Sequence, residues 1–246
     1  MAAPFGGVGE TDQTAWKRAA AAAAVADVPA DSVLGLGSGT TAELMLRVLA
    51  ERVRQGFRVT GVATSERTRA LAAALGISLL ALDDAPALDM SIDGADEVVL
   101  PALHVVKGRG GALLREKLVA AASRQRVIIV DDTKVVSALG ERDPVPVEVV
   151  AFGWSHTARR LTALGLRPQR RMLAADAATS ATARPFVTDT GNYILDCAIG
   201  AIADPAGLAQ AIKAQLGVVE HGLFVGMTER VYIGGAGGVR VAERGR

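Results

Sequence analysis

The chain has 246 residues, 50% of them hydrophobic but only 4% aromatic, and its formal net charge at pH 7 is +1. A core built mainly from Ala, Val, Leu and Ile is typical of layered α/β enzymes rather than of β-sandwiches. The small net charge argues against nucleic acid as a partner, because phosphate backbones are bound by clustered Lys and Arg. No run approaches the roughly 18 apolar residues of a membrane span, so we expect a soluble, cytoplasmic protein with no membrane contact.

In chain order, a helix is predicted over 11–28, where Ala, the strongest helix former, dominates. Strand-like and helical runs then alternate. The strands are expected at 32–36, 58–64, 77–82, 88–92 and 126–131, and the helices at 41–55, 65–75 and 111–123. This alternation predicts an α/β fold with an open, mostly parallel, Rossmann-like sheet and helices on both faces. The loops after residues 36, 60, 92 and 130 should converge on one cleft, because ligands bind beyond the carboxyl ends of such strands.

Prolines at 144 and 146 interrupt the alternation and indicate a smaller inserted α+β domain over 143–216, between the two parts of a main domain at 1–142 and 217–246. Its strands are expected at 147–151, 171–174, 185–188 and 193–198, and its helices at 155–164 and 205–214. Residues 175–184, rich in Ala, Thr and Ser, are interpreted as a mobile surface loop. The runs 218–225 and 230–233 are expected to return to the first sheet.

Cys197 is the only cysteine, so no intramolecular disulfide can form and a reducing compartment is expected. It lies in an apolar run, which favours a buried small side chain over a reactive thiol.

A glycine-hydroxyl turn, Leu-Gly-Leu-Gly-Ser-Gly-Thr-Thr at 34–41, closes a strand and opens a helix, where free backbone N–H groups favour an anion. Thr40 replaces the third glycine of the dinucleotide fingerprint, and the Gly-Lys ending of the P-loop is missing. The hydroxyls of Ser38, Thr40 and Thr41 suit a phosphate monoester or a sugar. An ordinary strand-to-helix turn with a Ser/Thr cap is an equal alternative.

An acidic turn, Asp-Gly-Ala-Asp-Glu at 93–97, follows an apolar strand, which places its carboxylates at the mouth of the same cleft. Gly94 and Ala95 are small enough to let the backbone approach a ligand closely. A solvated acidic turn, a helix N-cap and a divalent metal site are the alternatives. The three histidines lie at no ligand spacing, so a zinc site is not expected.

The segment Lys-Gly-Arg-Gly-Gly-Ala-Leu-Leu-Arg-Glu-Lys at 107–117 combines a glycine loop with a helix. Glu116 projects from an otherwise apolar stripe of that helix, where a carboxylate is costly unless it is used or paired. A general base is one interpretation, with Lys107 and backbone N–H groups stabilising the charge that develops on the substrate. A surface glutamate paired with a basic neighbour is the other. Lys134, just past a further strand, is either a surface charge or a second phosphate contact.

Taken together and in this order, these segments, with Pro-Val-Glu-Val at 146–149 and Thr-Asp-x-Gly-Asn at 188–192, resemble the A-type ribose-5-phosphate isomerases over nearly the whole chain. The resemblance implies interconversion of ribose 5-phosphate and ribulose 5-phosphate through an enediol, in the non-oxidative pentose phosphate pathway. It also implies that no metal or organic cofactor is needed, and that the protein is a homodimer or homotetramer.

By the same resemblance, Glu116 moves the proton between C2 and C1. Asp93, Asp96 and Lys107 bind the sugar oxygens and assist proton movement between O1 and O2, or ring opening. The residues expected to contact the phosphate or the rest of the substrate are Ser38, Gly39, Thr40, Thr41, Gly94, Ala95, Gly108, Gly110 and Lys134.

The sequence departs from the family pattern at Arg109, where glycine is common, at Leu114, where threonine is frequent, and at Thr190, where asparagine is frequent. Arg109 either adds a phosphate contact or lies outside the cleft. Two other functions fit a similar scaffold. A sugar-phosphate sensor would carry a DNA-binding helix-turn-helix, for which we expect no room before Trp16. An acyl-CoA transferase would use a glutamate as nucleophile.

Overall fold

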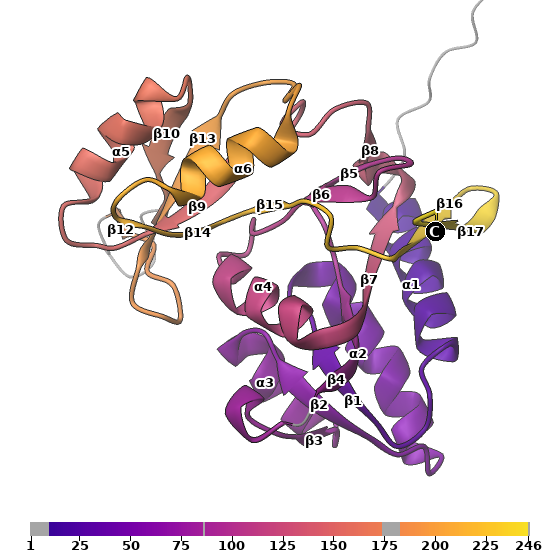
Figure 1. Cartoon of the computed structure of the whole chain (residues 1–246). Coiled ribbons are helices and arrows are strands. Elements are labelled where there is room, and N and C mark those ends of the chain that lie inside the picture. The colour runs from indigo at the N-terminus through magenta and orange to yellow at the C-terminus, as the bar shows by residue number, and fades with distance from the viewer. Residues whose placement is uncertain (1–9, 86, 174–182, 246) are drawn as a thin grey trace, which may run out of the picture.

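The computed structural model describes residues 10–85, 87–173 and 183–245 (Figure 1). Its main sheet contains, in spatial order, β17 (Gly238–Glu243), β16 (Arg230–Gly235), β7 (Ser123–Asp131), β4 (Leu88–Asp93), β1 (Ser32–Leu36), β2 (Val59–Ala63) and β3 (Ser78–Leu79). Every neighbouring pair is parallel except the β16–β17 hairpin. The predicted α/β class and mostly parallel sheet are therefore confirmed.

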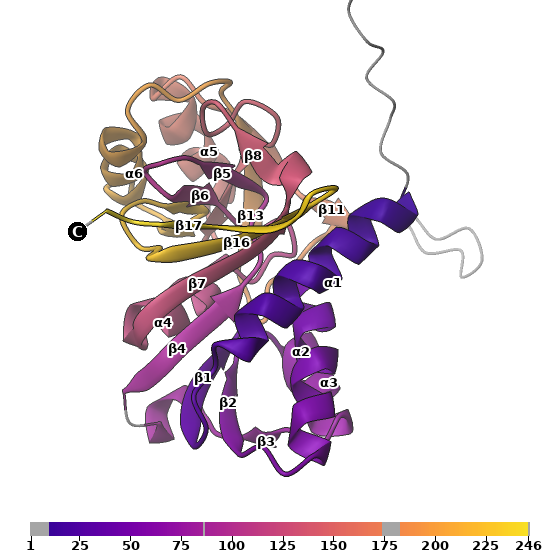
Figure 2. The same cartoon turned by 90° about the vertical axis from the view of Figure 1, so that its right-hand side faces the viewer.

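Helices cover both faces of this sheet, as predicted. Figure 2 shows α1 (Glu10–Ala26), α2 (Gly39–Arg54) and α3 (Glu66–Ala74) on one face and α4 (Leu113–Ala122) on the other. The alternation of side chains along β1 explains both layers. Leu34 and Leu36 belong to the core formed with α1, α2 and α3. Gly35 points to the opposite face, where a Cβ would lie 2.4 Å from Val119 of α4. The missing side chain thus allows α4 to pack closely.

A small sheet that was not predicted shares the second face with α4. It has the order β15 (Leu223–Phe224), β6 (His104–Val106), β5 (Glu97–Val99) and β8 (Val135–Val136). Val98 and Phe224 of this sheet pack against Ile128 of β7 in one buried cluster. Strands of two or three residues are too short to show an alternating pattern, which is why the sequence did not reveal them.

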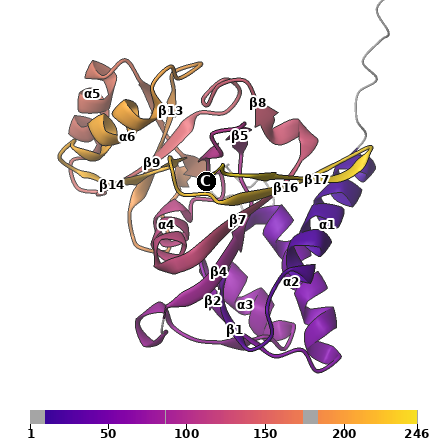
Figure 3. The ribbon, with the colours of Figure 1, turned by 45° about the vertical axis from the view of Figure 1, so that its right-hand side comes forward.

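The second unit has a four-stranded sheet in the order β10 (Arg167–Arg170), β13 (Tyr193–Ala198), β9 (Val145–Val149) and β14 (Val218–His221). Its helices are α5 (Trp154–Ala163) and α6 (Pro205–Lys213), and β11 (Met172–Leu173) pairs with β12 (Arg184–Pro185). Figure 3 shows this unit apart from α1, α2 and α3, with α4 between them. We propose domains at 1–142 with 217–246 and at 143–216. The separate sheet and a core that includes Val147, Leu161 and Leu195 support this division, although β14 lies just beyond residue 216.

The run predicted at 230–233 does return to the main sheet, as β16. The expectation for residues 218–225 was wrong, because β14 pairs with β9 and β15 with β6. Lys117 of α4 provides the physical reason. Its Nζ lies 2.7 Å from a Glu220 carboxylate oxygen and donates to the carbonyls of His221 at 2.7 Å and Leu223 at 3.1 Å. These contacts hold the segment over α4 and away from the main sheet.

Smaller differences lie within the second unit. Of the strand expected at 171–174 only β11 is found, and β10, which precedes it, was not predicted. The strand expected at 185–188 is reduced to β12 and a single bridge between Val187 and Tyr193. Of the loop predicted at 175–184, residues 175–182 lie outside the described residues, and Arg184 belongs to β12. Cys197 is buried as predicted, and burial together with Asp196 raises the pKa of its thiol to about 12.

None of the described helices is both long enough and apolar enough to span a membrane.

His221 leads to a prediction on stability. Its ring is buried, and its Nδ1 accepts the backbone N–H of Leu223 at 3.3 Å, which requires a neutral ring. Burial and the charge of Lys117 lower its pKa to about 4, whereas the side chain titrates near 6.5 in the unfolded chain. The folded state therefore binds fewer protons between these two values, so stability falls as the pH drops through this window.

We expect His221 to contribute a loss of about 1–3 kcal/mol in the free energy of unfolding between pH 7 and pH 4. His221→Asn keeps an acceptor near the Nδ1 position without a titration in this range. Urea unfolding at both pH values should therefore show a smaller loss for H221N than for the wild type. Equal losses in the two proteins would contradict this role.

Candidate active site

A pocket with about 810 Å³ of empty space lies at the carboxyl ends of β1 and β4, where the order of the strands reverses. Open α/β sheets bind their ligands at this topological switch point. Three of the four predicted loops contribute to its wall. The described residues that line it are Lys17, Ser38, Gly39, Thr40, Thr41, Gly94, Ala95, Asp96, Lys107, Gly108, Arg109, Gly110, Glu116 and Lys134. Every predicted site residue except Asp93 is among them.

Asp93 lies behind this pocket, in a small adjoining cavity that Lys107 and Glu116 also line. Gly37 allows it to approach β1, because a Cβ at that position would lie 2.2 Å from Asp93 Oδ1. That oxygen accepts the N–H groups of Ser38 at 3.0 Å and Gly94 at 2.7 Å. Asp93 is therefore fixed by the two loops that end β1 and β4.

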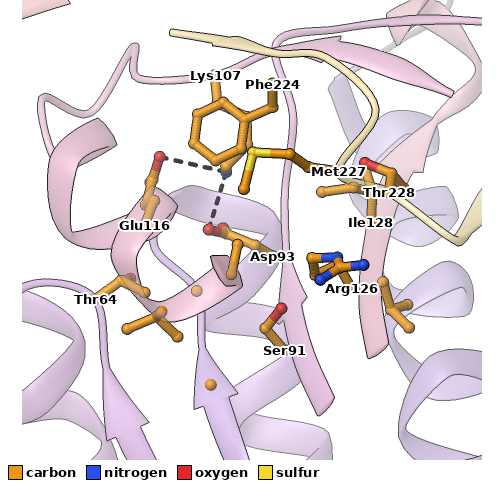
Figure 4. Close-up of a pocket in the computed structure, with 15 residues that line it drawn as sticks. Thr64, Ser91, Asp93, Lys107, Glu116, Arg126, Ile128, Phe224, Met227 and Thr228 are labelled. Carbon is orange, nitrogen blue, oxygen red and sulfur yellow. Dashed lines mark ion pairs between the residues drawn. The ribbon is translucent and has the colours of Figure 1, made fainter. Parts of the chain in front are cut away.

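Lys107 is buried between two carboxylates (Figure 4). Its Nζ lies 2.9 Å from Asp93 Oδ2 and 3.4 Å from Glu116 Oε2, and it donates to the carbonyl of Gly94 at 2.6 Å. The ring of Phe224 covers the ammonium group, with its centroid 5.7 Å away. A buried ammonium group is tolerated only when it is paired and hydrogen-bonded, and these partners meet that requirement.

The charges in this group determine which members carry protons. Burial raises the pKa of Asp93 to about 7, with Lys107 opposing the shift and Glu116 adding to it. Burial alone would lower the pKa of Lys107, but the charges of Asp93 and Glu116 hold it above its ordinary value. Burial also raises the pKa of Asp96, although the hydrogen bond from the backbone N–H of Arg109 opposes this shift. The site thus combines a permanent cation with a carboxyl group that exchanges its proton near neutral pH.

Glu116 is buried in the first turn of α4 and has one free oxygen. Ser38 donates its hydroxyl to Oε1 at 2.5 Å. Oε2 is buried and has no hydrogen-bond partner among the described residues, although Lys107 lies within ion-pair distance. A buried carboxylate oxygen without a partner is costly, so its retention indicates a role toward a ligand. The surface glutamate that the sequence left open as an alternative is not found.

The start of α2 offers backbone N–H groups to the same pocket. The side chain of Ser38, at the N-cap, makes no capping hydrogen bond because it is directed to Glu116. Gly39, with a φ of 85°, begins the helix. The first N–H groups of α2 are therefore left for an anion, in the positive field of the helix terminus.

Two lysines line the pocket as well. Lys134 lies in the short 3-10 helix η2 (Asp132–Lys134), which the Asp131 side chain caps by accepting the N–H of Thr133 at 3.0 Å. Lys17 comes from α1, with its Nζ 3.8 Å from Asp131 Oδ2. Lys17 was not predicted as a site residue, since a single lysine in an alanine-rich helix has no motif around it.

All carboxylates of the acidic turn were expected at the mouth of the cleft, but that of Glu97 lies elsewhere. Glu97 is 1% exposed and accepts the N–H groups of Gly140, Arg142 and Asp143 at 2.5, 2.7 and 2.9 Å. It is the first residue of β5, so its side chain is fixed by the small sheet rather than by the turn. Glu97 thus anchors the segment that leads into the second unit.

Arg109 lies at the rim of the pocket. Its guanidinium pairs with Asp143, and its Nε is 3.8 Å from Asp96. Its backbone N–H donates to Asp96 Oδ2 at 3.0 Å. The side chain is thus engaged by carboxylates in the structure. Thr190, a second departure from the family pattern, still donates its hydroxyl to the buried carboxylate of Glu148.

Comparisons with known proteins agree on one family. The family model described as ribose 5-phosphate isomerase A (phosphoriboisomerase A) matches residues 60–238. Ribose-5-phosphate isomerase A of Thermomicrobium roseum is 52% identical over 230 residues, 94% of each chain. The protein of the same name from Gloeobacter violaceus is 52% identical over 225 residues, 92% of this chain and 94% of the relative.

Solved structures give the same result. Ribose 5-phosphate isomerase A of Methanocaldococcus jannaschii superposes with a TM-score of 0.87 at 35% identity, over 94% of this chain and 99% of that one. A D-ribose-5-phosphate isomerase in complex with phospho-erythronic acid gives a TM-score of 0.88 at 33% identity, over 94% and 98% of the two chains. The chain belongs to the ribose 5-phosphate isomerase A family.

Proposed function

We propose that the chain interconverts D-ribose 5-phosphate and D-ribulose 5-phosphate through an enediolate, in the pocket between β1 and β4. One observation carries the proposal: Lys107 is buried between Asp93 and Glu116, in a pocket that also holds the uncapped start of α2. The names of the relatives and the phospho-erythronic acid bound to one of them support it. That ligand is a sugar acid with a phosphate, and its planar, negatively charged carboxylate has features in common with an enediolate.

The reaction moves two protons and needs no oxidant. Glu116 Oε2 takes the proton from C2 of the open-chain aldose, the electron pair forms the C1–C2 double bond, and negative charge develops on O1. The Lys107 ammonium group stabilises that charge. Glu116 then returns the proton to C1, while O2 loses its proton and becomes the carbonyl oxygen of the ketose.

Asp93 and Asp96 exchange the second proton, between O2 and O1, or assist ring opening. A carboxyl group with a pKa near 7 suits this task, because both of its protonation states are populated at the working pH. Asp96 lines the pocket and Asp93 lines the adjoining cavity, and Lys107 lines both. Gly94, Ala95, Gly108 and Gly110 form the wall along which the sugar passes.

The phosphate binds at the start of α2, to the N–H groups of Gly39, Thr40 and Thr41 and to the hydroxyls of the two threonines. Lys134 and Lys17 supply positive charge from the other side of the pocket. Residues of α1, α2 and η2 therefore bind the phosphate together, which holds the sugar carbons of the substrate beside Lys107.

We further propose the partners, the oligomeric state and the location of the protein. The net charge of +1 supports the absence of a nucleic-acid partner. Contact between copies, as a homodimer or homotetramer, is supported by exposed apolar side chains, among them Phe152 at 95% and Leu216 at 78% exposure. We also propose a cytoplasmic location, no membrane partner and no metal or cofactor, which the resemblance and the composition support. The buried carboxylate–lysine group favours an enzyme over a sensor.

We expect Glu116→Gln to lower kcat by about 10²–10⁴-fold, the usual contribution of a positioned general base. Formation of ribulose 5-phosphate from ribose 5-phosphate in the presence of EDTA measures the effect. Glu51→Gln is the matched control, since Glu51 lies on α2 and pairs only with the exposed Arg18 among the described contacts. Near-normal turnover in E116Q would remove Glu116 from the role of base.

We expect Lys134→Ala to raise KM about tenfold and to leave kcat within about threefold, because one charge-assisted hydrogen bond to phosphate contributes about 1.5–3 kcal/mol. The inhibition constant of inorganic phosphate, used as a competitive inhibitor, should rise by the same factor. Lys213→Ala serves as the control on the exposed side of α6. Unchanged KM and phosphate inhibition in K134A would place the phosphate elsewhere.

A further inference from the structure

Arg171 extends from the second unit to the loop that follows Lys107. Its Nη1 donates to the carbonyl oxygens of Arg109 at 2.8 Å and Gly108 at 3.1 Å. The residue lies between β10 and β11, about sixty positions further along the chain. Only 16% of its side chain is exposed, so water does not readily replace it at these carbonyls.

Asp196 of β13 fixes the guanidinium from the other side. Its two carboxylate oxygens accept Nε at 2.9 Å and Nη2 at 2.5 Å. This two-point geometry locks the plane of the guanidinium and directs the remaining N–H groups to the loop. The orientation of Arg171 is thus determined by β13 of the second unit.

The loop itself has few other means of keeping its shape. Gly108 and Gly111 have φ angles of 108° and 81°, and a Cβ at Gly110 would meet nothing within 4 Å. The backbone contacts that hold the loop are the N–H of Gly111 to the carbonyl of Gly108 at 2.9 Å, and the N–H of Arg109 to Asp96 at 3.0 Å. Glycine-rich loops have much conformational freedom to lose, so an external anchor matters here.

Phe186, also from the second unit, closes the loop at its other end. A Cβ at Gly111 would lie 2.4 Å from its ring. Residues of the second unit therefore contact both turn positions of the loop, immediately after Lys107 and just before the helix of Glu116.

We propose that Arg171, oriented by Asp196, is a positioning residue for the isomerisation. It acts through the carbonyls of Gly108 and Arg109, which keep Lys107 and Glu116 at the separation that proton transfer requires. The proposal rests on the proposed function, and it assigns a task in the reaction to the second unit. A shift of about 1 Å in such a group can cost about 10²-fold in rate.

The test compares Arg171→Ala with Arg170→Ala. Arg170 is the matched control because it precedes Arg171 in the chain, but its guanidinium stacks on Trp154 and Tyr193 within the second unit, at 4.4 and 5.5 Å from the ring centroids. We expect R171A to lose about 10–100-fold in kcat, and R170A to stay within about threefold of the wild type. The inhibition constant of inorganic phosphate should change little in both, because Arg171 does not line the pocket.

Two further measurements separate positioning from loss of structure. Guanidinium ion at non-denaturing concentration should restore part of the kcat of R171A, since it can occupy the vacated site between Asp196 and the two carbonyls, and should not stimulate R170A. Arg171→Lys should have a kcat close to that of R171A, because one ammonium group cannot bind Asp196 at two points and the two carbonyls at the same time. If R171A does not fold, Asp196→Asn replaces it, and a lower kcat at a wild-type Tm is expected.

The outcomes distinguish this inference from the function itself. A wild-type protein that does not convert ribose 5-phosphate overturns the proposed function. An active wild type with R171A or folded D196N at wild-type kcat overturns the positioning role, as does a loss in R171A that R170A shares and guanidinium does not restore.

Discussion

An ammonium group removed from water must be surrounded by negative charge and oxygen atoms, and the site is built around this requirement at Lys107. Its three partners come from two parts of the chain: Asp93 and the Gly94 carbonyl at the end of β4, and Glu116 on α4. Glycines make the approach possible. A Cβ at Gly222 would lie 2.1 Å from the Lys107 carbonyl oxygen, so the backbones can meet only without a side chain. The burial of the Lys107 charge therefore requires glycine where the backbones approach closely, as at Gly222.

The same constraint sets the chemistry. Two buried carboxylates beside one lysine leave an unbalanced negative charge. Burial and the charge of Glu116 therefore raise the pKa of Asp93 to about 7, so that it takes up a proton near neutral pH. The Glu116 oxygen that has no hydrogen-bond partner among the described residues lies 3.4 Å from the Lys107 ammonium group. An aldose–ketose conversion needs a base, a stabilised oxyanion and a proton exchanger, and these are the roles that we propose for Glu116, Lys107 and Asp93.

Much of this was predictable from sequence, for physical reasons that also explain the failures. Residues 32–36 and 193–198 were predicted as strands with the observed bounds, because five or six alternating or apolar residues are a strong signal. The site residues follow from glycines and charges at strand ends. Glu97 was wrongly expected in the cleft, because a turn motif does not show that the next residue begins a strand. The contact of Arg171 with the Gly108 carbonyl was not predicted, because the two residues lie about sixty positions apart in the chain.

Three consecutive residues of α4 face three different parts of the molecule. Arg115 contacts Glu66 of α3 and the Asp189 turn, Glu116 faces the pocket, and Lys117 binds the carbonyls of His221 and Leu223. Successive helical residues point about 100° apart, so a single turn connects all three. During synthesis, the reactive groups up to Lys134 leave the ribosome before the residues from 171 to 224 that hold them. The nascent chain thus carries the proposed reactive groups before it has the residues from 171 to 224 that contact them, and these distant contacts can close only later.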